Sequence, residues 1–310
     1  MNNKRVVVAL GRSAFGKNLP EQQHGVTIAA SAIADLIQMK YQVVITHSNG
    51  PQVGMIHTAM NEFSQRHEGY TPAPMSVCNA MSQGYIGYDL QNAIRTELLN
   101  RGIYKPVCTI ITQVKVDPFD RAFNKPIKSI GRILNDAEAE EKRKKGNFVT
   151  KEEDGWRRII ASPAPIEVYE LDSIRMLADA GHVVIAAGGG GIPVLEQGTR
   201  LKGASAVIEK DAVAAKLAHE LDADVLLFLT SDEQITIHKG TDEERKLGHI
   251  HLEEAFQIID AGLLSPNDLS PKLSAAAQFV SNGPNRIAIS TRLDKAKEGI
   301  REKIGTFVEA

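Results

Sequence analysis

Glycine and small polar residues follow four apolar segments of the sequence, and these are the places where chemistry is most readily expected. Four consecutive glycines, Gly188 to Gly191, stand out because glycine is costly in backbone entropy. Such a run is typical of a turn whose backbone N–H groups approach a phosphate closely, although a flexible hinge is the alternative. It is neither a Walker A loop nor a G-x-G-x-x-G fingerprint. The four glycine-bearing segments are Gly11–Ala14, Thr46–Gly54, Gly188–Pro193 and the residues around Thr230-Ser231-Asp232.

Two lysines are candidates for neutralising phosphoryl oxygens. Lys210 stands between Glu209 and Asp211 at the start of a predicted helix. A carboxylate in that place could hold the lysine or a Mg²⁺ ion. Lys272 begins another predicted helix and is the second candidate cation. A surface ion pair for the first lysine, and a structural role for the second, remain open alternatives.

No nucleophile or general base is evident. His47 follows a predicted buried strand and could be a base, but a structural histidine is the more common finding there. A hydrolase-like Ser–His–Asp arrangement is missing, and Cys78 and Cys108 are expected in the core. Glycine turns with lysines favour phosphoryl transfer, which depends on positioning and charge neutralisation. The residues by themselves therefore indicate a phosphate or nucleotide site and leave the substrate open.

Short apolar segments alternate with longer amphipathic ones along the chain, which predicts a mostly parallel sheet with helices on both faces. Ligands usually bind at the carboxyl ends of such strands. Predicted strands are Val6–Leu10, Gln42–Thr46, Val107–Thr112, His182–Ala187, Val225–Thr230 with Ile235–His238 as its neighbour, Arg286–Ser290 and 305–309. Predicted helices are 23–39, Gln52–Phe63, Gly84–Arg101, Leu171–Ala180, Lys210–Leu221, Leu252–Ala261 and Leu273–Val280.

Residues 117–165 interrupt this alternation. They contain the charge run Glu138–Lys145, which is most simply a solvated helix face, and the single tryptophan, Trp156. A segment of this length that departs from the strand and helix rhythm is a candidate lid or subdomain.

Composition excludes several classes of protein. A chain of 310 residues with 43% hydrophobic and 24% charged residues is globular, and its net charge of −2 argues against a nucleic-acid partner. Two cysteines cannot form a disulfide framework or a four-cysteine zinc site. No stretch approaches 18 apolar residues, and Val6–Leu10 is too short for a signal-peptide core. We therefore expect a soluble protein of the reducing cytoplasm, without a membrane partner.

From about residue 5 to 308 the sequence resembles carbamate kinase, a member of the amino-acid kinase superfamily. The strings Asn49-Gly50-Pro51-Gln52-Val53-Gly54 and Gly188-Gly189-Gly190-Gly191-Ile192-Pro193 are specific when they occur together in this order. The other matching segments are Val8–Gly11, Ser82–Tyr88, Thr112–Val114, Ala161–Pro163, Ala206–Asp211 and Pro271-Lys272.

The resemblance implies a single domain over residues 1–310 with an α/β fold, a three-layer α/β/α sandwich around a mostly parallel sheet, and a protruding lid-like subdomain at about 117–165. It implies a cytoplasmic homodimer that transfers phosphoryl reversibly between ATP and carbamate, giving ADP and carbamoyl phosphate, with Mg²⁺ and usually in arginine, agmatine or ureide breakdown. No metal-ligating residue is predicted.

The same resemblance suggests roles for individual residues. Lys210 and Lys272 would stabilise the transferred phosphoryl group, Asp211 would orient them, and Lys128 would reach over the substrate from the subdomain. Nucleotide and phosphate contacts are expected from Gly11, Gly50, Gly188, Gly189, Gly190, Gly191, Thr230 and Ser231, and substrate contacts from Arg12, Ser13, Ser48, Asn49 and Gly50.

Departures from the family pattern cluster in the binding loops. Arg12 and Ser48 both replace glycines, and Ser48 would be strained if its backbone required a positive φ. Arg12 could supply bidentate contact to a carboxylate or phosphate. The remaining departures are Ser13 for asparagine, Ser129 for proline, the shortened 152–157 and the altered 267–270.

Three functional hypotheses follow from these matches and departures. The first is a working carbamate kinase. The second is a kinase of the same fold that acts on another small carboxylate or carbamate-like acceptor. The third is a non-catalytic protein that binds nucleotide or carbamoyl phosphate. The presence of both Lys210 and Lys272 favours catalysis.

Overall fold

The structure is a computed structural model that describes residues 4–16, 18–265 and 269–310. Its centre is an eight-stranded sheet in the order β15-β17-β16-β12-β1-β2-β9-β3, parallel except where β16 meets β17. The strands are β1 (Arg5–Leu10), β2 (Gln42–His47), β3 (Val107–Thr109), β9 (Val183–Ile185), β12 (Val225–Thr230), β15 (His249–His251), β16 (Ile287–Arg292) and β17 (Thr306–Glu309).

The central strands are buried on both faces, which explains their continuous apolar sequences. Along β1, Val6, Val8 and Leu10 enter one hydrophobic cluster while Val7 and Ala9 enter another, because successive side chains point to opposite faces. The sheet therefore has a core on each side, as a three-layer architecture requires.

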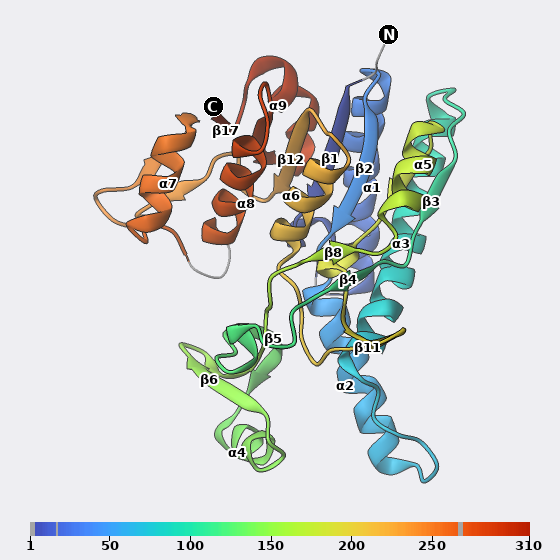
Figure 1. Ribbon diagram of the computed structural model, residues 1–310, viewed down its shortest axis with the longest axis vertical. Coiled ribbons are helices and arrows are strands. Elements are labelled where there is room, and N and C mark those ends of the chain that lie inside the picture. Colours follow the sequence, from blue (N-terminus) through green and yellow to red (C-terminus); the bar gives the residue numbers. More distant parts are fainter. Residues whose placement is uncertain (1–3, 17, 266–268) are drawn as a thin grey trace.

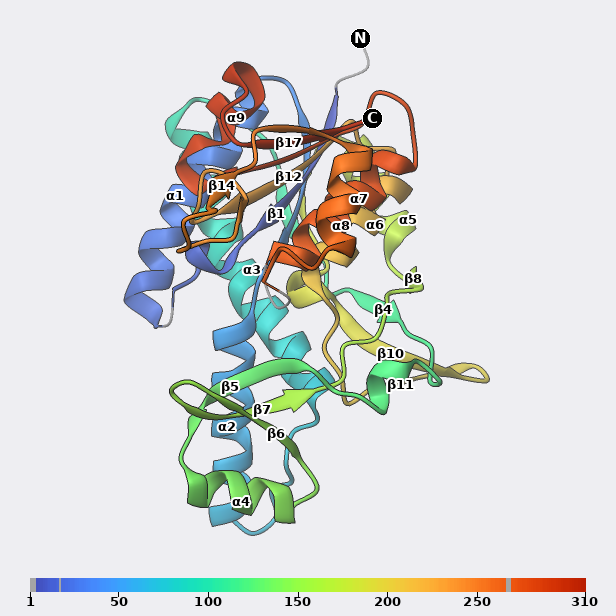
Figure 2. The ribbon, with the colours of Figure 1, turned by 90° about the vertical axis from the view of Figure 1, so that its left-hand side faces the viewer.

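Helices cover each of these two faces (Figure 2). This arrangement confirms the predicted α/β fold with a mostly parallel sheet between two helical layers. One layer contains α1 (Leu19–Gln38), α3 (Met75–Asn100) and α9 (Ala296–Glu302), and the other contains α5 (Leu171–Asp179), α6 (Lys210–Glu220), α7 (Leu252–Asp260) and α8 (Leu269–Ser281).

A small antiparallel sheet protrudes from the carboxyl-terminal edge of the main sheet (Figure 1). Its strand order is β5-β7-β6, and a helix with an Asn135 capping box, α4, packs against it. The helix α2 (Gly50–Arg66) runs from the main body alongside it (Figure 2). The elements are β5 (Lys128–Leu134), α4 (Asp136–Lys144), β6 (Phe148–Glu152) and β7 (Gly155–Ile160), with a 3-10 turn at Arg121–Phe123 before them.

Two further small sheets complete the fold. A four-stranded one has the order β11-β10-β4-β8, from Arg200–Gly203, Ile192–Gln197, Gln113–Lys115 and Glu167–Val168. In the other, β13 (Thr236–Ile237) pairs with β14 (Arg245–Lys246). The prediction that Ile235–His238 lies beside Val225–Thr230 was therefore wrong, since β12 lies between β1 and β16. A strand only two residues long carries too little periodicity to reveal its partner.

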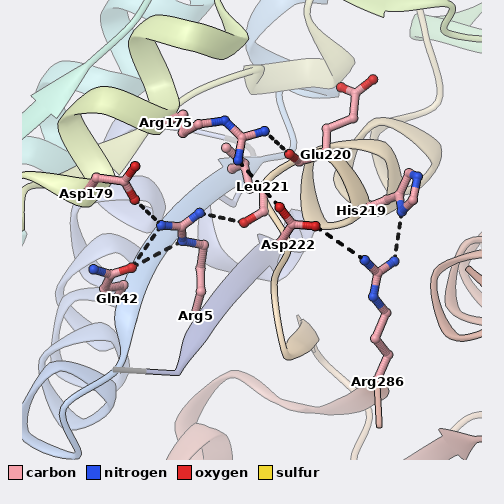
Figure 3. A network of polar contacts seen from close by, with 9 residues as sticks. All are labelled: Arg5, Gln42, Arg175, Asp179, His219, Glu220, Leu221, Asp222 and Arg286. Atoms are coloured by element: carbon pink, nitrogen blue, oxygen red, sulfur yellow. Dashed lines mark hydrogen bonds and ion pairs between the residues drawn. The ribbon is translucent and has the colours of Figure 1, made fainter. Parts of the chain in front are cut away.

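The carboxyl end of α6 is held by arginines from distant parts of the chain (Figure 3). Arg5, at the start of β1, donates to the Leu221 carbonyl, and Arg175 of α5 donates to the Glu220 carbonyl. Arg286 lies 2.8 Å from His219 Nδ1. Cations at a helix carboxyl end satisfy its last carbonyls and complement its dipole. This end of α6 is therefore fixed by three separate segments.

No helix within the described ranges is long and apolar enough to cross a lipid bilayer.

Candidate functional site: a lysine pair on a buried carboxylate beside a glycine turn

The four glycines form a tight, buried turn at the end of β9. Gly188–Gly190 make one turn of 3-10 helix, and Gly189, Gly190 and Gly191 have φ values of 66°, 85° and 83°. A Cβ on Gly189 would lie 2.1 Å from Asn49 Nδ2, and one on Gly190 would lie 2.4 Å from the Ile208 carbonyl oxygen. The run is therefore neither loose nor a hinge, because it needs both the left-handed backbone and the close approach that only glycine allows.

Buried amides hold this turn in place. Gln83 of α3 donates to the carbonyl of Gly188 at 3.0 Å and accepts from the Thr112 N–H at 2.8 Å. Asn49 donates to Asn79 Oδ1 at 2.8 Å and to Ser82 Oγ at 2.9 Å. Fully buried amides that are hydrogen-bonded in this way fix their surroundings in one arrangement.

His47, the last residue of β2, packs behind the turn. It is 1% exposed, and a Cβ on Gly188 would lie only 2.2 Å from its Nε2. Its Nδ1 lies 3.0 Å from the Ser48 carbonyl oxygen. Burial, helped by the charge of Lys210, lowers the pKa of His47 to about 4, so the ring is neutral at pH 7. Enclosure in the core fits a structural histidine better than a base.

Two lysines meet at one buried carboxylate where α6 begins. Lys210 donates to Asp211 Oδ1, and Lys272 of α8 donates to Asp211 Oδ2 at 3.0 Å. Asp211 is 3% exposed and Lys272 is 6% exposed. The structure thus brings together three predicted site residues, and neither lysine belongs to a surface ion pair. α8 begins at Leu269, so Lys272 lies within its first turn rather than ahead of it.

The electrostatics of this cluster are those of an anion site. Burial alone would raise the pKa of Asp211, but the two lysines outweigh it and hold that pKa below its ordinary value. Burial and the neighbouring Lys272 lower the pKa of Lys210 against the pull of Asp211. Two cations share one carboxylate here, in a place where little water screens their charges.

The subdomain contributes a third lysine. Lys128, the first residue of β5, forms an ion pair with Glu209, which directly precedes Lys210. Glu209 was expected only as part of a charged triplet, and its contact with the subdomain was not predicted. Nothing local distinguishes this contact, since the two residues are 81 positions apart.

The remaining predicted contacts lie at the carboxyl ends of neighbouring strands. The Gly11 N–H donates to the Leu229 carbonyl at 2.8 Å, and a Cβ there would lie 2.9 Å from that oxygen. Gly50 begins α2, and a Cβ there would meet open space. Thr230 ends β12, where its hydroxyl donates to the Asp232 carbonyl, and Ser231 beside it is exposed.

Arg12 and Ser13 lie on an exposed turn directly after Gly11, and among the described residues no ion pair joins Arg12 to the lysine cluster. Ser48 donates its N–H to the Leu10 carbonyl at 3.0 Å. It is not among the described residues with positive φ, so the strain considered for a serine at this place does not arise.

Most of the other departures from the family pattern lie on the protruding subdomain. The shortened 152–157 forms the turn between β6 and β7, where Arg157 donates to Glu152 at 2.9 Å. Ser129 also donates to Glu152, at 2.8 Å. Asn267 and Asp268 of the altered 267–270 lie outside the described residues. The two cysteines are free, Cys78 buried and Cys108 half-buried.

Gln83 was not predicted as a site residue, although it lies within the matching segment Ser82–Tyr88. The sequence signal for this role was weak: a glutamine between serine and glycine, on a helix whose apolar residues form no clear stripe. A buried amide side chain nearly always forms hydrogen bonds, so a buried glutamine there indicates polar groups beside it.

A model of the amino acid kinase family matches residues 4–290. With this sheet, glycine turn and lysine pair, the chain belongs to the amino acid kinase family. It is 48% identical over 309 residues to the carbamate kinase-like protein YqeA of Escherichia coli, covering 99% of both chains. It is 42% identical to a carbamate kinase of Clostridium perfringens, covering 98% of this chain and 99% of the relative.

Solved structures agree with the sequence comparison. The carbamate kinase of Giardia lamblia bound to AMP-PNP superposes with a TM-score of 0.89 at 33% identity, covering 99% of both chains. The resemblance to carbamate kinases and the predicted fold are thereby confirmed.

Proposed function

We propose that this protein is a phosphotransferase that moves a phosphoryl group reversibly between ATP and carbamate, so that ADP and carbamoyl phosphate give ATP and carbamate. The observation that carries this proposal is the pair of lysines, Lys210 and Lys272, held on one buried carboxylate beside the glycine turn. Carbamate kinases of similar sequence, and one bound to an ATP analogue, support the choice of substrates.

The chemistry requires little covalent help from the protein. In the direction of ATP synthesis, an oxygen of the β-phosphate of ADP attacks the phosphorus of carbamoyl phosphate. An O–P bond forms to ADP while the bond to the carbamate oxygen breaks, and its electron pair leaves on carbamate. Negative charge builds up on the transferred oxygens, where Lys210 and Lys272 would neutralise it. Neutral carbamate need not form, so no general acid is required.

The other predicted site residues would have the following roles in this reaction. Asp211 would keep the two ammonium groups oriented, and backbone N–H groups of Gly188–Gly191 would face the phosphates. Lys128 would close over the acceptor from the subdomain of about residues 117–165, and Thr230 would border the nucleotide.

Magnesium would arrive with the nucleotide. Within the described ranges, no group of three or more His, Cys, Asp or Glu side chains is placed to hold a metal ion. Asp211 is already engaged by two lysines. The phosphates of ATP or ADP would thus supply the ligands for Mg²⁺. We also propose that the protein is a homodimer in the cytoplasm, as the resemblance to the family implies.

A coupled assay tests this function. ADP, carbamoyl phosphate and Mg²⁺ are supplied, and ATP formation is followed through hexokinase and glucose-6-phosphate dehydrogenase. We expect turnover that falls at least about 100-fold in Lys210→Ala, as removal of one preorganised charge donor typically gives. A folded wild-type chain without ATP formation above background contradicts the proposal.

A second candidate is a kinase that acts on another small acid. Arg12, exposed after β1 where the family pattern has glycine, favours it because a guanidinium binds carboxylates in a bidentate manner. Arg12→Gly combined with Ser48→Gly distinguishes the two. Higher activity with carbamoyl phosphate in the double variant favours another natural acceptor, and lower activity favours carbamate.

A further inference from the structure

A cleft of about 660 Å³ separates α2 from the protruding subdomain. His57 lies on the α2 wall, and Arg158 of β7 and Lys142 of α4 lie on the subdomain wall. In the described part of the chain, its lining contains none of the residues assigned above to the phosphoryl-transfer site. A close backbone contact, with Gly54 against Gly131, lies along its border. The cleft is therefore a second hollow with its own chemistry.

Most charges that line the cleft already have partners. Arg132 forms an ion pair with Glu138, and Lys145 forms one with Glu141 at 2.6 Å. Glu62, the third lining carboxylate, adds to the negative potential around Arg132. Glu138 and Glu141 also lie near enough to Lys142 for its charge to help lower their pKa values.

Arg158 differs from these paired cations of the cleft. It is half-buried, and no carboxylate among the described residues lies within ion-pair distance of it. Burial lowers the pKa of its guanidinium, with no carboxylate to offset this. An arginine that is partly desolvated without a counter-charge costs stability, so its placement calls for an anion.

Two further groups lie around Arg158. Lys142, half-buried one turn from Glu138, brings a second positive charge. His57 lies close enough to both cations that they help burial to lower its pKa to about 4. A neutral imidazole can still donate one N–H. Donors from α2, α4 and β7 therefore converge on the same hollow.

We infer that this cleft binds a phosphate group, either free phosphate or that of a small phosphomonoester, between Arg158, Lys142 and His57. A guanidinium fork with an ammonium group matches the several oxygens of a phosphate. Val53, Ile130 and Leu134 line the remaining volume and would receive an organic substituent. A ligand held there would join the subdomain to α2, whose N-cap residue Asn49 packs against the glycine turn.

Trp156 provides a local probe of this binding. It is the single tryptophan, lies on β7 two residues from Arg158, and stacks under Arg143 of α4. Inorganic phosphate and glycerol 3-phosphate are titrated separately into the full-length chain while the fluorescence of Trp156 is followed. Calorimetry on the same samples counts the sites. Arg158→Gln removes the proposed ligand-binding group, and Arg157→Gln is the matched control, since Arg157 does not line the cleft and is paired with Glu152.

We expect saturable binding whose Kd rises at least tenfold in Arg158→Gln and stays within twofold in Arg157→Gln and in Lys210→Ala. Lys142→Gln, on the other element, should also weaken binding and serves if Arg158→Gln does not fold. Tighter binding of glycerol 3-phosphate identifies a phosphomonoester site, and tighter binding of inorganic phosphate a free-phosphate site. Equal affinity in Arg158→Gln and Arg157→Gln, loss of binding in Lys210→Ala alone, or no saturable binding overturns the inference. Because Lys210→Ala is expected to be inactive but still to bind at the cleft, this result is independent of the proposed reaction.

Discussion

Lys272 Nζ lies 3.0 Å from Asp211 Oδ2, the carboxylate oxygen that Lys210 does not use, across 61 residues of sequence. One buried aspartate thus joins the first turns of two helices that come from different parts of the chain. Asp211 therefore both links two helices and positions two cations. Its loss should affect the stability of the fold and the rate of the reaction, and the two effects can be measured separately.

Asp211→Asn should remove the negative charge that Lys210 and Lys272 share. Removal of one member of a buried ion pair typically costs about 3–5 kcal/mol, and we expect a loss of stability of that order together with a large fall in kcat. Urea denaturation and the coupled assay measure the two effects. Asp294→Asn, which breaks an exposed pair with Arg292, is the control and should change stability by less than about 1 kcal/mol. Similar losses in both variants would contradict this reading of Asp211.

His47 should make stability depend on pH in a defined window. Its folded pKa of about 4 lies below the ordinary value of 6.5, so between these pH values the unfolded chain binds a proton that the folded chain does not. The free energy of unfolding therefore rises with pH across the window and falls as the medium is acidified, by about 3 kcal/mol in all.

Denaturation at pH 4.5, 5.5 and 6.5 measures this slope in the wild type and in His47→Gln. We expect the variant to have the smaller slope, whatever its stability at pH 7. His57, whose pKa is also lowered to about 4, acts in both chains, so the difference isolates His47. Identical slopes would show that folding does not lower the pKa of His47.

Lys128 should affect substrate capture and turnover through the subdomain. Its contact with Glu209 keeps it beside the lysine pair. We expect Lys128→Met to lower kcat/KM for carbamoyl phosphate by about 100-fold, the loss that follows removal of a charge-stabilising donor. Lys125→Met, at an exposed position just before β5, should have no effect. Steady-state kinetics with both variants checks this, and an unchanged kcat/KM in Lys128→Met would remove Lys128 from the site.

The glycine turn offers a test of close packing with a matched control. Gly189 and Gly198 have similar φ values of 66° and 61°, but a Cβ would meet Asn49 at the first and open space at the second. Gly198→Ala should cost about 1 kcal/mol, from backbone strain alone. Gly189→Ala should cost distinctly more and abolish activity. Thermal denaturation compares them, and equal losses would mean that contact with Asn49 is unimportant.

Much of the fold could be predicted because buried strands and amphipathic helices leave local patterns. Val6–Leu10 was predicted as a strand and is buried along its length. The start of α3 at Met75 was missed, since the predicted helix began at Gly84. This helix packs against α1, α2 and β3 along its length, so its buried residues do not form one clear stripe.

The site was harder to predict where it depends on contacts across the chain. The glycine run and Lys210-Asp211 are adjacent residues with unusual chemistry, and they could be found by inspection. The contact of Lys128 with Glu209 and the hydrogen bonds of Gln83 depend on tertiary structure, which places residues together that no local pattern connects. The resemblance to carbamate kinases suggested the role that we propose for Lys128, and spacing alone did not.

The arginine clamp on α6 has a consequence for how the protein folds (Figure 3). The helix presents Lys210 at one end, while its other end is held by Arg5, Arg175 and Arg286, which come from the beginning, middle and end of the chain. Loops this long close slowly, because the entropy of closure must be lost before the contacts form. The charge pair of the site is therefore expected to become fixed only after almost the whole chain has been assembled, because Lys272 and Arg286 both come from its last quarter.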